Sequence, residues 1–110
     1  AYQEYLGSQG IQVLSAAQLP PELAAIPHPP LVLFGRGSLA ALAGPRVAVV
    51  GSRTPTRYGL WATAEVVDCL AAHRLTTISG MMTGIDLAVH QQSLQQGTPS
   101  IGILGFGFGQ

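Results

Sequence analysis

The sequence is poor in charge, and the few charged residues that it has include no lysine. Only 9% of its 110 residues are Asp, Glu, Lys or Arg, against roughly 25% in an average soluble protein. Five arginines balance five acidic residues, so no long-range field attracts the whole chain to nucleic acid or to a membrane. A free-standing domain usually needs more charge to cover its surface. We therefore expect a fragment whose apolar surface meets further chain or a partner.

Long apolar runs and paired cysteines are also missing. No apolar stretch approaches the ~20 residues of a spanning helix, and the N-terminus lacks the pattern of a secretory signal. The single cysteine, Cys69, excludes an intrachain disulfide and is compatible with a reducing cytoplasm. Its apolar neighbours favour a buried helical thiol over a reactive one.

The stretch that organises the chain is residues 47–59. An apolar run, Val47–Val50, stops at Gly51 and is followed by a polar loop with two arginines and then by a helical pattern. Such a run is typical of a strand buried on both faces. Strand, glycine turn and helix begin a doubly wound α/β domain.

The same alternation continues to the end of the chain. Helices are predicted at 58–73 and 84–96, and further strands at 75–78 and 100–104. We therefore expect residues 46–110 to form the first half of a Rossmann-like α/β domain, a parallel sheet with helices on both faces. Residues 1–45 form a lead-in segment with strands at 11–14 and 31–34, and with a short helix at 19–26 that has prolines in its first turn.

Three predicted strands each end at a glycine, namely Gly51, Gly80 and Gly105. Because right-handed crossovers place the carboxyl ends of parallel strands at one edge, we expect the three loops to lie together. Glycine lets backbone N–H groups approach a ligand closely, and helix N-termini favour anions. The sequence therefore predicts a phosphate site at this edge.

Two arginines, Arg53 and Arg57, lie in or next to the first of these loops. A guanidinium makes paired hydrogen bonds to a phosphate, which an ammonium group does not. The alternative for Arg53 is a structural salt bridge, and for Arg57, in the first turn of the helix, both kinds of role stay open. A dinucleotide-binding loop needs a glycine where Arg53 stands, so NAD binding is disfavoured.

A second helix start lies in the loop after the second strand. We expect Thr83 as its N-cap and Asp86 near the third helical position, in a capping-box arrangement. Asp86 and His90 are four residues apart and therefore share a helix face. A structural pair is favoured, and an acid–base or metal pair is the alternative. The sequence has no Cys/His metal spacing, nucleophile elbow or Walker loop, so no cofactor or metal is expected.

Aromatic residues near this edge are candidates for stacking on bases. The candidates are Tyr58, Phe106 and Phe108. The two phenylalanines could equally well pack into the core. Trp61 falls with Glu65 on the polar side of its helix. It either lies flat at a boundary or contacts further chain.

These blocks resemble the DNA-processing protein A family (DprA, also called Smf). Residues 26–37 are similar to the family's lead-in "dPPxxLfxrG", and residues 47–59 to its "vaiVGSRxxTxYG" block. Ser79-Gly80, Gly84–Asp86 and His90 resemble "SGxAxGIDxxxH". The resemblance runs from about residue 20 to the end, and the order of several separate blocks makes it specific.

The resemblance implies a cytoplasmic bacterial protein with an extended Rossmann-like domain that binds single-stranded DNA without strong sequence preference. It also implies a homodimer, no enzymatic activity, and a role in natural transformation by loading a RecA-type recombinase onto incoming strands. By position, Gly51, Ser52 and Arg53 line the family's DNA-binding pocket, and Gly80 lies in the second loop. The full set of expected DNA or phosphate contacts is Gly51, Ser52, Arg53, Arg57, Gly80, Thr83 and Gly105.

The chain departs from the family in the second loop. Thr83 stands where many members have Arg or Lys, and Met82 replaces an alanine. The lost charge predicts weaker or differently arranged DNA binding. One alternative is a nucleotide-processing enzyme of the lysine-decarboxylase-like phosphoribohydrolase type, which has a similar glycine-serine turn and needs a "PGGxGT" loop. A family member that serves only as a protein-interaction scaffold is another.

Overall fold

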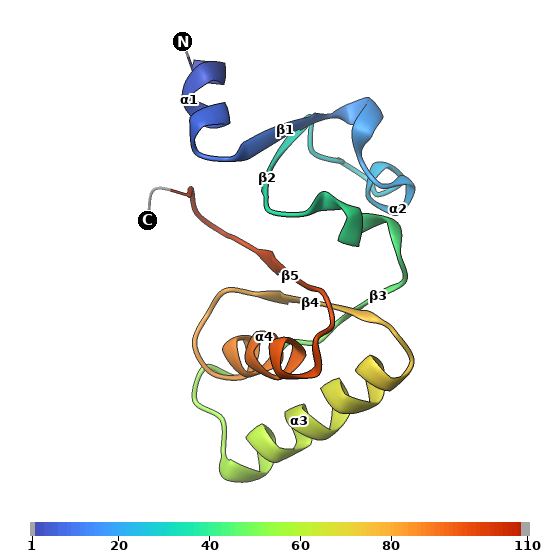
Figure 1. The fold of residues 1–110 in the computed structure, drawn as a ribbon, viewed down its shortest axis with the longest axis vertical. Helices are drawn as coiled ribbons and strands as arrows, with labels where there is room; N and C mark the ends of the chain where they lie inside the picture. Colours follow the sequence, from blue (N-terminus) through green and yellow to red (C-terminus); the bar gives the residue numbers. More distant parts are fainter. Residues whose placement is uncertain (1, 109–110) are drawn as a thin grey trace. The chain divides into compact units, whose positions relative to one another are not determined.

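A computed structural model describes residues 2–108 of the chain. The chain divides into two compact units, unit 1 at Ala1–Ala43 and unit 2 at Gly44–Gln110 (Figure 1). The predicted boundary between residues 45 and 46 lies close to this division. Among residues 2–108, no helix combines the length and the apolar content that crossing a bilayer requires.

Unit 1 is built on a two-stranded antiparallel sheet. β1 (Ile11–Ser15) pairs with β2 (Val32–Arg36), with Leu14 opposite Leu33. The predicted strands at 11–14 and 31–34 are therefore confirmed. The other elements of the unit are short helices: α1 (Tyr2–Ser8), η1 (Ala16–Gln18), α2 (Pro21–Ala24) and η2 (Leu39–Ala43).

Prolines open α2, as the sequence predicts. Pro20 is the N-cap and Pro21 the first helical residue, where a missing N–H costs nothing. In contrast, α1 was not predicted from the sequence. Gly10, with a φ of 71°, separates it from β1 and supplies the left-handed backbone conformation of the turn between them.

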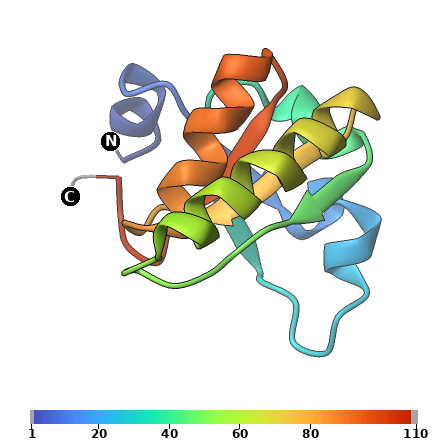
Figure 2. The same ribbon diagram turned by 90° about the horizontal axis from the view of Figure 1, so that it is seen from below.

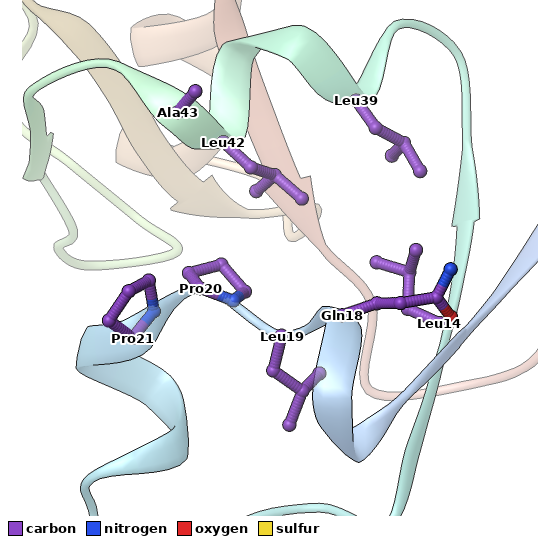
Figure 3. A pocket seen from close by; sticks show the side chains of 8 residues that line it. All are labelled: Leu14, Gln18, Leu19, Pro20, Pro21, Leu39, Leu42 and Ala43. Carbon is purple, nitrogen blue, oxygen red and sulfur yellow. The ribbon is translucent and has the colours of Figure 1, made fainter.

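An apolar pocket opens in unit 1 between η2 and the segment that joins β1 to α2. Leu39 and Leu42 lie on one side of it, and Gln18, Pro20 and Pro21 lie on the other (Figure 3). None of its lining residues is charged, and the Gln18 side-chain oxygen already accepts two hydrogen bonds. The pocket therefore offers apolar surface without polar groups that converge on a ligand.

Unit 2 is a parallel sheet with the strand order β3-β4-β5. Two helices connect its strands, and both lie on one face of the sheet, packed against each other (Figures 1 and 2). The elements in chain order are β3 (Arg46–Ala48), α3 (Arg57–Ala72), β4 (Thr76–Gly80), α4 (Ile85–Gln96) and β5 (Ser100–Ile103). This confirms the predicted Rossmann-like α/β class, while in unit 2 the described helices cover one face rather than both.

The core of unit 2 lies between the two helices and the sheet. Val67 of α3 and Val89 of α4 have no exposed surface, and Ile85 and Val49 pack with them. The prediction that Val47–Val50 is buried on both faces is wrong, because β3 ends at Ala48 and Val50 is 69% exposed. Only the face that carries the helices buries the strand.

Helix α3 buries less of its surface than its apolar pattern predicts. Its buried residues are Thr63 and Val67, while Leu60 and Val66 are exposed. The predicted buried thiol is also wrong, since Cys69 is exposed. The helix contacts the rest of unit 2 along one side only, so these residues face away from the core.

Candidate nucleic-acid interface

The carboxyl ends of β3, β4 and β5 define one edge of the sheet. All three strands are parallel, with Ala48 opposite Ile78 and Gly80 opposite Ile103. The loop 49–56 leaves the sheet at this edge, as do the loop 81–84 and the segment from residue 104 onward. The topology therefore brings the predicted glycine turns to a common edge, as expected.

Two of these loops are in direct backbone contact. The Ile85 N–H, the first of α4, donates a hydrogen bond of 3.0 Å to the Ser52 carbonyl oxygen. Gly84 has a φ of 90°, and a Cβ at this position would collide with that oxygen and lie 2.7 Å from the Cα of Arg53. Only glycine allows so close an approach. The segment that carries Ser52 and Arg53 is therefore held against the start of α4.

The Ile85 side chain packs against the loop 49–56 at Gly51. It is 8% exposed, and a Cβ on Gly51 would lie between 2.8 and 3.0 Å from three atoms of its side chain. The turn at Gly51 thus needs a residue without a side chain, because Ile85 fills that space. The sequence pattern did not indicate this role for Ile85, since nothing local links it to position 51.

Three hydroxyl-bearing residues shape the loop between β3 and α3. Ser52 Oγ accepts a hydrogen bond of 3.0 Å from the Thr54 N–H. Thr56 is the N-cap of α3, and its Oγ1 accepts a 3.0 Å hydrogen bond from the Gly59 N–H. These bonds fix a short loop without a core of its own. Thr56 was missed by the sequence prediction, although a threonine directly before a helical pattern is a recognised N-cap signal.

Arg53 and Arg57 are both exposed. Within residues 2–108, neither guanidinium takes part in a hydrogen bond or an ion pair. The salt bridge that was the alternative role for Arg53 is therefore not formed by this part of the chain. Arg57 is the first residue of α3, as predicted, and its charge opposes the positive end of the helix dipole. The two arginines thus form a small basic surface with free donors.

The prediction of Thr83 as N-cap of α4 is wrong. Gly84 is the N-cap and supplies no side-chain hydrogen bond, and Thr83 is exposed in the loop before it. The Ser52 carbonyl takes the place of a capping side chain by accepting from Ile85. This cap comes from a residue 33 positions earlier in the sequence, so no local pattern indicates it.

The predicted capping box at Asp86 does not form either. Asp86 is the second residue of α4 and is 8% exposed, and its Oδ1 has no hydrogen-bond partner within the described residues. A Cβ on Gly80 would lie 2.5 Å from its Oδ2. A buried carboxylate already occupies the first turn of α4, which disfavours an added anion there. A phosphate at this edge is therefore disfavoured next to the first turn of α4 and favoured next to the first loop, which carries Arg53 and no acidic residue.

The His90 side chain makes hydrogen bonds to both β4 and β5. Its Nε2 lies 2.8 Å from the Gly80 carbonyl oxygen and its Nδ1 lies 2.7 Å from Ser100 Oγ. Because a carbonyl only accepts, Nε2 carries a hydrogen and donates it. Ser100 Oγ is in turn 2.7 Å from Thr77 Oγ1. The favoured pair of Asp86 with His90 is therefore wrong, and the histidine is structural in another way.

The third loop contributes least to the assembled site. Gly105 is exposed, and a Cβ there would meet nothing within 4 Å. The described residues contain no group of three His, Cys, Asp or Glu side chains able to hold a metal ion. The structure thus brings Gly51, Ser52 and Arg53 together with the loop 81–84, whereas Gly105 shares only the edge of the sheet.

Unit 2 is a parallel sheet whose first loop packs on the start of the second helix and carries an exposed arginine at the carboxyl edge. These features define a Rossmann-like α/β protein. Residues 11–110 match the sequence profile of the DNA recombination-mediator protein A family. The chain belongs to this family.

Named relatives agree with this assignment. The chain is 39% identical over 88 residues to the DNA processing protein DprA of Streptococcus pneumoniae, covering 80% of this chain and 31% of that protein. It is 33% identical over 111 residues to DprA of Bacillus subtilis, covering 98% of this chain and 36% of the relative. The chain thus spans about a third of the length of these two relatives.

Solved structures show the same fold. The X-ray structure of DNA processing protein A from Streptococcus pneumoniae superposes with a TM-score of 0.86 at 33% identity, over 98% of this chain and 39% of that one. The protein from Helicobacter pylori, described for its unique single-stranded DNA binding mode, superposes with a TM-score of 0.75 at 25% identity. That comparison covers 86% of this chain and 42% of the other.

Proposed function

We propose that this chain binds single-stranded DNA through its phosphates at the carboxyl edge of unit 2. The observation that carries the proposal is a pair of exposed arginines: Arg53, on a loop that Gly84 and Ile85 hold in place, and Arg57, at the start of α3 directly after that loop. Because these contacts already hold the loop in the free protein, DNA binding loses less conformational entropy than it would with an unsupported loop. The single-stranded DNA binding described for the Helicobacter pylori relative supports the choice of ligand.

The remaining predicted contacts are proposed as backbone and hydroxyl partners of the strand. Gly51 and Ser52 place exposed backbone next to Arg53, and the Thr83 hydroxyl stands where a basic side chain is common in the family. The first N–H of α4 already donates to Ser52, so the helix start itself contributes less than the sequence predicted. Gly80 and Gly105 are proposed to border the path of the strand.

Beyond DNA binding, the proposal follows family membership. The intact protein would act in the cytoplasm in DNA uptake and recombination, as a binding protein and not an enzyme. It would load a RecA-type recombinase onto single strands and work as a homodimer. The family match and the named relatives favour this role over the phosphoribohydrolase alternative.

The proposal is tested by comparing two variants that remove the same charge from opposite edges of the sheet. Arg74 is exposed and lies just before β4, at the amino edge. Arg53→Gln and Arg74→Gln of the intact protein are titrated with a labelled oligothymidine at several salt concentrations. Each phosphate contact on a single strand contributes about 0.7 to the slope of log affinity against log salt.

We expect Arg53→Gln to weaken binding and to lower this slope by about 0.7, while Arg74→Gln changes neither appreciably. Net charge is the same in the two variants, so a difference between them reports the position of the arginine. Equal effects, or no effect of Arg53→Gln, would contradict the proposed site.

A further inference from the structure

Two large aromatic side chains stand exposed at the start of α3. Tyr58 is 72% exposed and Trp61 is 59% exposed. Their ring centroids are 5.8 Å apart and the ring planes are tilted by 35°. Tryptophan is usually well buried in a folded protein, so a tryptophan exposed beside a tyrosine on one helix face points to a binding surface.

The charges around this aromatic pair differ along the helix. Arg57 directly precedes Tyr58, and Arg53 lies in the loop before it, both exposed and without partners among the described residues. Glu65 follows Trp61 by one helical turn. The pair therefore lies between a basic surface and an acidic side chain. A polyanion is attracted to the N-terminal side of the rings and repelled from the other side.

We propose that Tyr58 and Trp61 form a stacking platform for bases of the single strand whose phosphates bind at Arg53 and Arg57. This rests on the proposed function and adds base contacts to it. Every base has a π-face, so stacking on aromatic rings binds single strands without sequence readout. The neighbouring arginines favour nucleic acid as the occupant over further chain or a second copy. An apolar protein surface that covered them would bury two unpaired guanidinium charges, which is costly, whereas DNA phosphates would pair with them.

The other aromatic candidates fit this role less well. Phe106 is 42% exposed, which is less than either ring of the pair. Phe108 is partly buried and takes part in other interactions. Of the aromatic residues predicted near the edge, Tyr58 has the largest exposed fraction and a second ring at its side.

The test separates base contacts from phosphate contacts. The intact protein is titrated with oligothymidine and with an abasic strand of the same length, which has the phosphates but no bases. Tyr58→Ala and Trp61→Ala are each compared with Trp61→Phe, which keeps an aromatic ring, and with Leu94→Ala. Leu94 is 75% exposed on α4, so this last variant is the control for trimming an exposed apolar side chain.

Each aromatic-to-alanine change is expected to weaken oligothymidine binding by about 5- to 150-fold and to leave abasic binding unchanged. Trp61→Phe retains most of the affinity, and Leu94→Ala behaves as the unmodified protein. The platform is refuted if Trp61→Ala weakens both strands alike. It is also refuted if Trp61→Ala changes only the oligomeric state in sedimentation, since the rings then contact protein.

The platform and the proposed function fail in different ways. If Arg53→Gln weakens both strands but neither aromatic variant affects oligothymidine, the phosphate site stands and the platform does not. If Arg53→Gln affects neither strand, the proposed function fails whatever the aromatic variants do.

Discussion

Gly84→Ala is the substitution that bears most directly on how the site is built. Gly84 has a φ of 90° and a ψ of −132°, a backbone conformation that residues with a side chain avoid at a cost of about 1–3 kcal/mol. A Cβ there would also collide with the Ser52 carbonyl oxygen. To relieve the collision, the loop that carries Arg53 must move away from α4.

The expected loss of stability follows from these contacts. The variant also loses the 3.0 Å hydrogen bond from the Ile85 N–H to the Ser52 carbonyl oxygen. This bond is worth about 1 kcal/mol net. Together they predict a destabilisation of about 2–4 kcal/mol. The displaced Arg53 is expected to lose its phosphate contact, and a charged hydrogen bond of about 1.5–3 kcal/mol corresponds to roughly 10- to 150-fold in affinity.

Gly97→Ala is the matched control. Gly97 also has a positive φ, of 71°, but a Cβ there would meet nothing within 4 Å. It follows the C-terminus of α4, at the other end of the helix from Gly84. The left-handed backbone alone costs about 1–2 kcal/mol, so this variant is expected to lose some stability and to keep its affinity for DNA.

The assay is thermal unfolding of the intact protein, followed by oligothymidine titration at a temperature where each variant is fully folded. We expect Gly84→Ala to lose more stability than Gly97→Ala, and we expect only Gly84→Ala to lose DNA binding. If both variants bind alike and unfold alike, the contact between the two loops does not position the arginines, and the account of the site is wrong.

Three further changes test other parts of the structure. Thr83→Arg places a basic side chain at an exposed position and is expected to raise oligothymidine affinity about two- to fivefold, measured by titration at low salt. An unchanged affinity would mean that the loop lies off the DNA path. Thr56→Ala removes the N-cap bond to Gly59 and should cost about 1 kcal/mol of stability, measured by thermal or urea unfolding, with Thr56→Ser as the variant that restores it. His90→Ala leaves the Gly80 carbonyl without its donor and should cost about 1–3 kcal/mol; a loss of DNA binding without a loss of stability would show that the histidine is not structural.

Local patterns predicted the elements of unit 2 well. The apolar runs and glycines placed β4, α4 and β5 close to their observed bounds, because hydrophobic periodicity and turn residues act within a few positions along the chain. The same reasoning could have identified Thr56 as the N-cap of α3. The parallel order of the strands followed from the βαβ alternation and the hand of its crossovers.

Contacts between distant residues were not predictable in this way. The cap of α4 by Ser52, the packing of Ile85 under Gly51 and the bonds of His90 to β4 and β5 depend on tertiary proximity. The predicted burial of α3 was also wrong. An apolar pattern shows which residues suit a core, but it does not show which side of the helix other elements cover. Cys69 is exposed for that reason.

We propose that phosphates bind at the loop after β3, which carries Arg53, and at Arg57 directly after it. The most direct measurement is a nuclear magnetic resonance titration of the isotope-labelled intact protein with a short abasic strand, read at backbone amides and at arginine Nε–H groups. We expect the largest shifts at residues 51–57, with smaller ones at 80–84 and none at residues 73–75 on the opposite edge. Shifts that leave 51–57 unchanged and gather elsewhere on the protein would contradict the proposal.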